Sequence, residues 1–273
     1  MLLGLIGDPV SLSWSEFLFN RLFRYENKKN IYVAANVSRD SLPRILDPDL
    51  SPFHAMNITA PYKEASLIYL PNRSPEVWKI GSTNLAVRSG EGFIAHNADY
   101  LGFKHTLESG NIELDGRNIA ICGSGGLART VLYTVLTEYS PASVHILTRD
   151  PESTKKRYNG VTMFSSILLE NYETKSEFDV AINCTSLGMR TGDKTPLEGK
   201  HFKSRALAID LTYQNRETEF MRNAVKNGGK AFNGREMFFS QARETYRIAF
   251  GDYPPDDLFK RVSEEVIKWA EKA

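Results

Sequence analysis

The sequence has few of the features that mark disulfide-rich, membrane or nucleic-acid-binding proteins. It has two cysteines in 273 residues, Cys122 and Cys184, and neither belongs to a C-x-x-C pair. No apolar run is long enough to span a bilayer, and Met1 to Asp8 lack the basic start of a secretory signal. The 34 Lys and Arg against 33 Asp and Glu leave a net charge of +1, which gives no general field for nucleic acid or an anionic membrane. We therefore expect a cytoplasmic protein with a small-molecule partner, and neither nucleic acid nor membrane as partners.

Several signatures of catalysis are also absent. The five histidines show no metal-ligand spacing, among themselves or with the cysteines, so we expect no metal site. The sequence has no G-x-S-x-G nucleophile elbow and no Walker lysine motif. The two cysteines are therefore interpreted as small core residues of a protein in a reducing compartment.

A glycine turn stands between a short apolar run and a helical pattern. Residues 118–122 form the apolar run, and helical spacing continues from Thr130. Between them Gly123, Gly125 and Ala128 follow the spacing G-x-G-x-x-G/A. In that turn the first glycine permits the bend, the second lets a pyrophosphate approach the backbone, and the small third residue lets helix pack on strand. A sharp turn without a ligand is the alternative, since the glycines alone are a weak signal.

Strand candidates alternate with helical stretches from residue 118 onward, which predicts a parallel, doubly wound sheet in an α/β protein. These strand candidates are Ile119 to Cys122, Ser143 to Leu147, Asp179 to Asn183, Ala206 to Leu211 and Lys230 to Phe232. The part before them predicts strands at Leu2 to Ile6, Ile31 to Asn36 and Ala55 to Ile58, and a hairpin of Leu85 to Arg88 with Phe93 to His96. The end of the chain predicts helices over Met237 to Phe250 and Asp256 to Lys272.

The end of the second strand in this alternating region bears on the choice between NAD and NADP. An acidic residue there would hold the ribose 2′-hydroxyl of NAD, whereas an arginine suits the 2′-phosphate of NADP. Asp150 precedes Pro151 and makes a good helix N-cap, which leaves Arg149 without a structural role. Lys155 and Lys156 add positive charge nearby. The sequence therefore favours NADP.

Polar side chains follow the strand candidates in the first hundred residues. Ser13 and Ser15 precede an apolar helix, so either could cap it or bind a small carboxylate. Thr59 and Lys63 follow a strand at the kind of edge where open α/β sheets bind ligands, although Lys63 alone could be a solvated surface charge. Asp99 could be the N-cap of the helix that follows it, or part of a polar site.

Taken together, these segments resemble the shikimate dehydrogenase family. Each match is weak alone, but the ordered set spans the chain and is specific. The matching segments are Gly7 to Ser15 (Ser-x-Ser), Asn57 to Lys63 (Asn-Val-Thr-x-Pro-x-Lys), Gly81 to Asn84 (Gly-Ala-x-Asn), Asn97 to Asp99 (Asn-Thr-Asp), Gly123 to Gly126, Thr148 to Asp150 (Asn-Arg-Thr), Asn183 to Met189, Asp210 to Tyr213 and Gly234 to Ala242.

The resemblance implies an enzyme that interconverts shikimate and 3-dehydroshikimate with NADP, in the route to aromatic amino acids. Residues 1–100 would form a substrate-binding catalytic domain and residues 101–235 a Rossmann-like NADP domain. Residues 236–273 would be helices that return to the substrate domain, and hydride transfer would take place in the cleft between the domains. The assembly would be a monomer or a homodimer.

The resemblance also implies roles for the residues at matched positions. Ser13 and Ser15 would bind the substrate carboxylate. The remaining substrate contacts would come from Thr59, Asn84, Tyr213 and Gln241. The cofactor would contact Gly123, Ser124, Gly125, Gly126, Leu127, Thr148, Arg149, Leu211 and Gly234.

Lys63 and Asp99 would flank the reacting hydroxyl. Oxidation of a secondary alcohol requires removal of the hydroxyl proton, so we expect Lys63 to be the general acid/base and Asp99 its orienter and proton partner. A lysine can do this only if it spends time neutral, which burial favours and a nearby carboxylate opposes. The position of the proton within the pair is therefore left open.

The chain departs from the family pattern around the expected pocket. Leu12 replaces a usual His, and Glu16 replaces a frequent Pro. Beside the matched Asn, Asp and Gly, the family's usual residues are replaced by Leu85, Ala98, Tyr100 and Arg235-Glu236. None of these removes a proposed catalytic group, but Leu85 and Tyr100 could reshape the pocket. Two alternatives stay open: a paralogue that oxidises quinate or another hydroxylated ring acid, with NAD in place of NADP, and a non-catalytic NADP-binding sensor. A sensor needs only the glycine turn, so the retained Lys63 and Asp99 argue against it.

Overall fold

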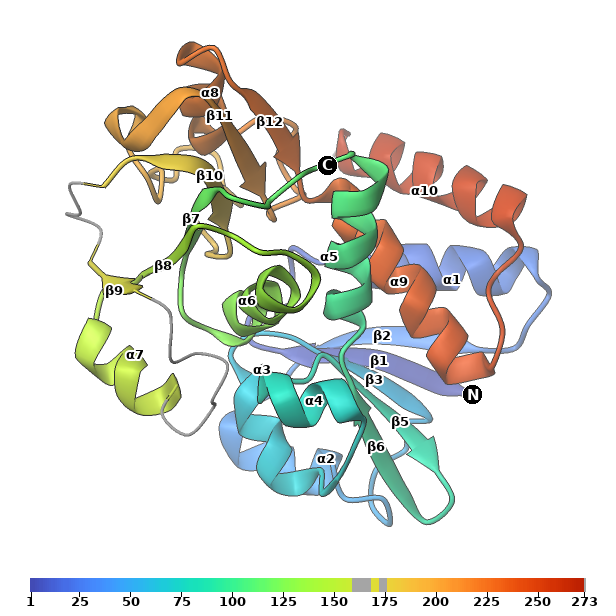
Figure 1. The fold of residues 1–273 in the computed structure, drawn as a ribbon. Helices are drawn as coiled ribbons and strands as arrows, with labels where there is room; N and C mark the ends of the chain where they lie inside the picture. Colours follow the sequence, from blue (N-terminus) through green and yellow to red (C-terminus); the bar gives the residue numbers. More distant parts are fainter. Residues whose placement is uncertain (159–167, 172–175, 273) are drawn as a thin grey trace. The chain divides into compact units, whose positions relative to one another are not determined.

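The computed structural model describes residues 1–158, 168–171 and 176–272 (Figure 1). The chain divides into two compact units, one formed by Met1–Gly102 with Phe239–Ala273 and the other by Phe103–Phe238. The range 101–235 expected for the cofactor domain includes residues 159–167 and 172–175, which lie outside the described residues.

The first unit contains a six-stranded mixed sheet in the order β2-β1-β3-β5-β6-β4. β1 pairs in parallel with β2 and β3, whereas β5 is antiparallel to both β3 and β6. The elements up to the boundary are β1 (Leu2–Gly7), α1 (Ser15–Tyr25), β2 (Ile31–Asn36), α2 (Leu42–Ile45), β3 (Ala55–Ile58), α3 (Tyr62–Ala65), β4 (Asn72–Arg73), α4 (Pro75–Ile80), β5 (Leu85–Ser89), β6 (Gly92–His96) and α5 (Ala98–Ser109). Short 3₁₀ turns cover Arg39–Ser41 and Ser66–Tyr69.

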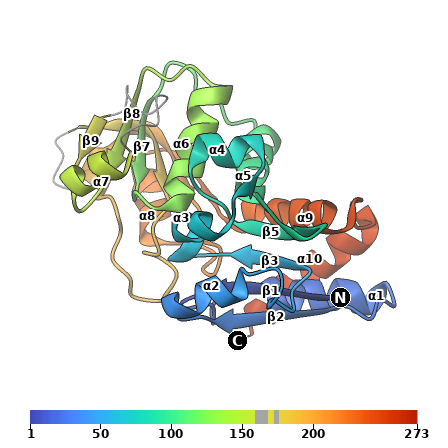
Figure 2. The same cartoon turned by 90° about the horizontal axis from the view of Figure 1, so that it is seen from below.

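Helices cover both faces of this sheet because its strands alternate apolar side chains between them. On one face Ile6, Met56 and Ala86 pack with Leu42 of α2 and Val77 of α4 in a buried cluster. On the other face lie α1 and two helices from the end of the chain, α9 (Arg235–Phe250) and α10 (Asp256–Ala270) (Figures 1 and 2).

Two contacts fix the helices of the second face. The Phe19 ring of α1 stacks on Tyr32 of β2 with centroids 4.6 Å apart. The Asn57 amide of β3 donates to the Thr245 hydroxyl of α9 at 3.0 Å. The last helices of the chain therefore return to the sheet built by the first hundred residues.

The second unit contains a parallel sheet in the order β12-β11-β10-β7-β8-β9. The chain runs from β7 outward to β9 and then returns to β10 on the other side of β7, so the sheet is doubly wound. Its elements are β7 (Asn118–Cys122), α6 (Gly126–Glu138), β8 (Ser143–Leu147), α7 (Pro151–Tyr158), β9 (Leu168–Glu170), β10 (Phe178–Asn183), β11 (Phe202–Asp210), α8 (Glu219–Lys226) and β12 (Lys230–Asn233), with a 3₁₀ turn at Gly199–His201.

The second sheet is also covered on both faces. Ile119 and Ile121 of β7 pack with Val131 of α6 and Leu107 of α5 on one face. On the other face Ala120 belongs to a cluster with Phe220 of α8. Burial on both faces explains why these strands are almost continuously apolar in the sequence.

The structure confirms the α/β class and the doubly wound parallel sheet. The predicted strands and the predicted hairpin are all present, with ends that agree to within a few residues. β4 and β9 were not predicted; they have two and three residues, too few for a period-two pattern. Among the described residues, no helix has both the length and the apolarity needed to cross a membrane.

Candidate active site

The predicted substrate and catalytic segments of the first unit leave one edge of its sheet. The register pairs Ile6 with Ile58, Asn57 with Leu85, and Leu85 with His96. The carboxyl ends of β1, β3 and β6 therefore meet the amino end of β5. Segments that are distant in the sequence are brought together by this strand order, at the kind of edge where open α/β sheets bind ligands.

Lys63 and Asp99 form an ion pair at this edge. Lys63 lies in α3 just after β3, and Asp99 in the first turn of α5 just after β6. The Lys63 Nζ donates to Asp99 Oδ2 at 2.5 Å, and the two side chains are 14% and 9% exposed. Because the pair is mostly shielded from water, its interaction is stronger than that of a surface pair. A solvated surface charge is therefore the wrong interpretation of Lys63.

Asparagine side chains fix the carboxylate side of the pair. Asn97 Oδ1 accepts from the backbone N–H of Tyr100 at 3.0 Å, and its Nδ2 donates to the Ser82 carbonyl at 2.9 Å. Asn84 Oδ1 accepts from the N–H of Ala98 at 2.7 Å. The helix α5 thus begins at Ala98 with Asn97 in the capping role, and the alternative of Asp99 as N-cap is wrong. Asp99 is left to bind Lys63.

The two serines lie at the start of α1, but neither is its N-cap. Trp14 holds that position, in a helical backbone conformation, because a turn from Val10 to Ser13 leads directly into the helix. The Ser13 hydroxyl accepts from the N–H of Ser15 at 3.2 Å and donates to the Ser15 hydroxyl at 3.1 Å. The predicted capping is therefore wrong, and the two hydroxyls lie side by side.

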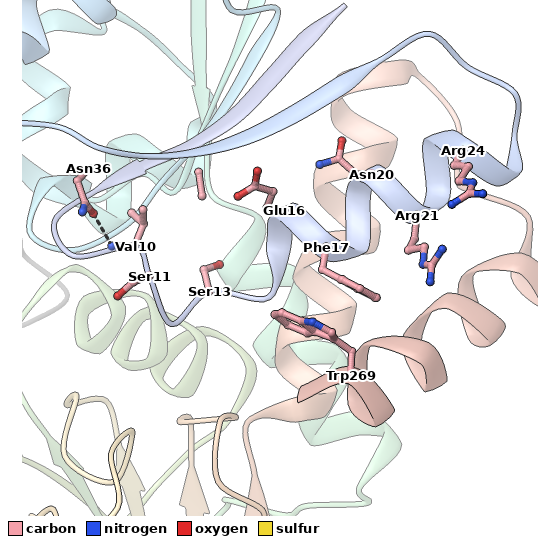
Figure 3. A pocket seen from close by; sticks show the side chains of 11 residues that line it. Val10, Ser11, Ser13, Glu16, Phe17, Asn20, Arg21, Arg24, Asn36 and Trp269 are labelled. Carbon is pink, nitrogen blue, oxygen red and sulfur yellow. Dashed lines mark hydrogen bonds between the residues drawn. The ribbon is translucent and has the colours of Figure 1, made fainter. Parts of the chain in front are cut away.

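A pocket of about 710 Å³ opens beside Ser13 (Figure 3). Glu16 and the stacked rings of Phe17 and Trp269, whose centroids are 4.6 Å apart, also line it. Lys63 is not among the lining residues. The pocket therefore reaches one predicted carboxylate-binding serine from the α1 side and is not lined by the predicted catalytic residues Lys63 and Asp99.

The other predicted substrate residues are divided between the units. Thr59 lies between β3 and α3, and its N–H donates to the carbonyl of Ile6 at 2.9 Å. Gln241 lies on α9 in the first unit, where a Cβ at Gly102 of α5 would come within 2.8 Å of its Cβ. Tyr213 belongs to the second unit, where its ring packs on Phe238.

His96, which ends β6 beside the Asn97-Asp99 segment, makes stability depend on pH. Burial lowers the pKa of His96 below its usual 6.5; Glu76 opposes this shift and Arg247 adds to it. Because the folded state then binds fewer protons than the unfolded state, the free energy of unfolding is highest above the unfolded pKa and decreases as pH falls from that value through the lower folded pKa. We expect the melting temperature to fall from about pH 7.5 to about pH 5, and to fall less in His96→Gln.

The matched control is His105→Gln, since the His105 side chain is 55% exposed and its ion pair with Glu236, which is 54% exposed, contributes little to stability. Its pH profile should follow the wild type. An unchanged profile in His96→Gln would contradict this account.

The glycine turn of the second unit has the three features that a dinucleotide needs. Gly123 has φ +105°, which favours glycine, and Ala128 is fully buried at the point where α6 packs on the sheet. Gly125 is the N-cap residue of α6, and no side chain at this position hydrogen-bonds to the first N–H groups of the helix. A Cβ at Gly125 would find no heavy atom within 4 Å. The backbone at Gly125 therefore borders open space directly before the first turn of α6, and the turn fits a pyrophosphate.

All the predicted cofactor residues lie at the carboxyl edge of the second sheet or in the first turn of α6. The register aligns Cys122 with Leu147 and Asn183, and Asn183 with Asp210. Residues such as Thr148 and Leu211, which follow those strand ends, therefore lie at the same edge as Gly123.

The segment after β8 is held as the sequence predicted. The Asp150 Oδ1 accepts from the N–H of Ser153 at 2.9 Å, which confirms its capping of α7. Arg149 is exposed. The Thr148 hydroxyl lies 3.1 Å from the Ser124 hydroxyl, so the predicted cofactor residues of two strand ends are in direct contact.

A buried carboxylate that the sequence did not single out organises the segment after β11. Asp210 accepts from the Thr212 N–H and hydroxyl at 3.0 and 2.9 Å, from the Asn183 amide at 2.9 Å and from the Thr218 hydroxyl at 2.5 Å. Burial raises the pKa of Asp210 and these hydrogen bonds oppose the shift. The signals in the sequence were its position at the end of an apolar strand and at the start of the matched segment Asp210 to Tyr213.

Gly234 has a packing reason for being glycine. A Cβ there would lie 2.4 Å from the Leu211 carbonyl oxygen. Its contact with a cofactor stays a prediction. Within residues 1–158, 168–171 and 176–272, no three His, Cys, Asp or Glu side chains are placed to hold a metal ion.

Comparisons with known proteins agree with this geometry. Residues 5–86 match the family model described as the shikimate dehydrogenase substrate binding domain. A shikimate dehydrogenase (NADP(+)) of Thermoplasma acidophilum is 30% identical over 268 residues, covering 97% of this chain and 96% of the relative. The chain belongs to the shikimate dehydrogenase family. A second relative with the same name, from Pyrococcus abyssi, is 31% identical over 96% of this chain and 97% of its own.

Solved structures of the shikimate dehydrogenase family have the same fold. The Thermus thermophilus enzyme, in complex with NADP(H) and shikimate, is 25% identical and has a TM-score of 0.84 over 97% of this chain and 99% of its own. A chorismate mutase/shikimate 5-dehydrogenase fusion protein from Clostridium acetobutylicum is 29% identical, with a TM-score of 0.85 over 99% and 98%.

Proposed function

We propose that this chain oxidises a ring hydroxyl of shikimate to the ketone of 3-dehydroshikimate with NADP, and reduces the ketone in the reverse direction. The observation that carries the proposal is the shielded ion pair of Lys63 and Asp99, at the sheet edge where the other matched substrate segments of the first unit also end. Membership of the shikimate dehydrogenase family and relatives named for NADP support it.

Lys63 acts as the general acid/base. In the oxidation direction its amine takes the proton of the reacting hydroxyl, and in the reverse direction its ammonium returns that proton. Asp99, 2.5 Å from Nζ, holds the lysine in one orientation and shares the proton. NADP, when bound, accepts the hydride that leaves the same carbon.

The remaining matched residues orient the substrate. Ser13 and Ser15 present two hydroxyls 3.1 Å apart, a spacing that suits the two oxygens of a carboxylate. The substrate hydroxyls would be bound by Thr59, Asn84, Tyr213 and Gln241. Leu85, where the family usually has Thr, is fully buried and offers no hydroxyl.

The deciding experiment follows the absorbance of reduced nicotinamide when purified protein meets shikimate or quinate, each with NADP and with NAD. Rapid reduction of NADP with shikimate supports the proposal. Faster reaction with quinate or with NAD points to the paralogue. Absence of reduction with either acid, while NADP still binds, points to the sensor.

Two expectations stay predictions. The chain is expected to be a monomer or a homodimer, which light scattering after size-exclusion chromatography distinguishes. A cytoplasmic location is the other, and fractionation of the cells that make the protein would check it.

A further inference from the structure

Arg157, a residue that the sequence did not single out, reaches the dinucleotide turn from α7. Its Nη2 donates to the Ser124 hydroxyl at 2.8 Å and to the Ser124 carbonyl at 2.9 Å. Lys155 and Lys156, its neighbours in the same basic run, are exposed and make no hydrogen bond to this turn among the contacts of the described residues. Thr154 and Tyr158 are buried, which sets the rotation of the helix and brings Arg157 to the turn.

The position of Arg157 is fixed by a second arginine. Arg129 of α6 is 5% exposed, and its Nη2 donates to the Arg157 carbonyl at 2.5 Å. The Arg129 guanidinium also lies over the Tyr158 ring, 4.6 Å from its centroid. A cation at the last carbonyls of a helix is favourable, because that end carries partial negative charge. The end of α7, and Arg157 with it, is therefore anchored to the helix that follows the glycine turn.

Arg157 lies where a nucleotide-binding sheet places the substituent on the ribose 2′ carbon. In doubly wound sheets this point is the end of the strand next to the glycine turn. Here that end is Thr148, whose hydroxyl contacts the same Ser124 hydroxyl that accepts from Arg157. Arg149 follows Thr148 directly. Arg157 thus contacts Ser124 directly, and Arg149 follows the strand-end residue that contacts the same hydroxyl.

We propose that Arg157 is a specificity-determining residue for the 2′-phosphate of NADP, acting together with Arg149. The proposal rests on the proposed use of NADP. A guanidinium has five N–H donors and binds phosphate oxygens with charge-assisted hydrogen bonds, so Arg157 can bind the phosphate while it keeps a contact with Ser124. A neutral ribose hydroxyl gains much less from the same cation.

The test measures the binding of 2′,5′-ADP and of 5′-AMP to the full chain by calorimetry, since only the first carries a 2′-phosphate. We expect Arg157→Gln to weaken 2′,5′-ADP by about 10- to 100-fold, the range for a lost hydrogen bond to a charged group, and 5′-AMP by less than about twofold. Arg157→Lys should keep part of the affinity. The control Lys226→Gln removes the same charge from an exposed position in the last turn of α8, which leads to the amino end of β12, and should change both affinities little.

The ratio of kcat/KM for NADP to that for NAD should fall in parallel in Arg157→Gln. Equal weakening of both nucleotides, or unchanged binding of 2′,5′-ADP in a variant with the wild-type melting temperature, would overturn the proposal, since Arg157 would then only tie α7 to the turn. Failure of the proposed function looks different: the wild type would prefer 2′,5′-ADP over 5′-AMP and still not oxidise shikimate.

Discussion

Turnover of shikimate with NADP falls by roughly a hundred- to ten-thousand-fold in Lys63→Ala, while NADP binding stays almost intact. This range is the usual contribution of a well-placed general acid/base. The Lys63 ammonium lies 2.5 Å from Asp99 and the side chain is only 14% exposed, so water cannot easily take its place. Steady-state rates and the fluorescence change on NADPH binding measure the two effects separately.

Removal of Lys63 also leaves the shielded Asp99 carboxylate without its cation, which destabilises a folded protein. Melting temperatures are therefore measured together with the rates. The variant Asp99→Asn, which removes the charge but keeps the shape, separates the loss of stability from the loss of the general acid/base. Lys79→Ala is the matched control, because Lys79 is an exposed lysine of α4 in the same unit. Near-normal turnover in a folded Lys63→Ala variant would contradict the assignment of Lys63 as the general acid/base.

Features that depend on neighbouring residues could be predicted from the sequence. The glycine turn combines an apolar run, three small residues and a helical pattern within about a dozen positions, and each part has a local physical reason. The capping of α7 by Asp150 is local in the same way, since Pro151 and the N–H of Ser153 lie within three residues of it. The strand-turn-helix structure and the Asp150 cap are both confirmed, whereas the contact of the turn with a cofactor stays a prediction.

Features that depend on the order of strands or the rotation of a helix could not be derived from pattern alone. Lys63 and Asp99 are 36 residues apart and meet because β5 and β6 place the start of α5 beside the end of β3. Resemblance suggested the pair, but only the register shows why it forms. Asp99 and Asn97 are both good caps, and the choice depends on where α5 begins.

The basic run of α7 shows the same limit. The sequence places positive charge at Lys155, Lys156 and Arg157 alike. Which of the three reaches Ser124 depends on the side of α7 that faces the core, and this is set by the burial of Thr154 and Tyr158. Composition can show that a positively charged surface exists, whereas helix rotation decides which residue acts.

Gly125→Val should weaken NADP binding by at least about a hundredfold with little change in stability. Gly125 has φ −85°, so a side chain is not strained there, and its Cβ would meet no heavy atom within 4 Å. The added methyl groups would instead occupy the space through which a pyrophosphate approaches the first N–H groups of α6. Hydrogen bonds to charged groups contribute about 1.5–3 kcal/mol each, so the loss of two accounts for the effect.

Calorimetry with NADP and thermal melting together decide whether Gly125 is needed for the ligand or for the fold. Replacing a residue at an N-cap costs the protein at most about 2 kcal/mol, so the melting temperature of Gly125→Val should fall by only a few degrees. The control Gly199→Ala lies in the turn before β11, at the opposite edge of the same sheet, where a Cβ makes ordinary contacts of 3.7 Å or more. A Gly125→Val variant that binds NADP normally would show that the open turn is only a bend between strand and helix, and a large loss of stability would assign the glycine to the fold. Weakened NADP binding at a melting temperature within a few degrees of the wild type fits neither of these alternatives. It would mean that NADP binds at the start of α6.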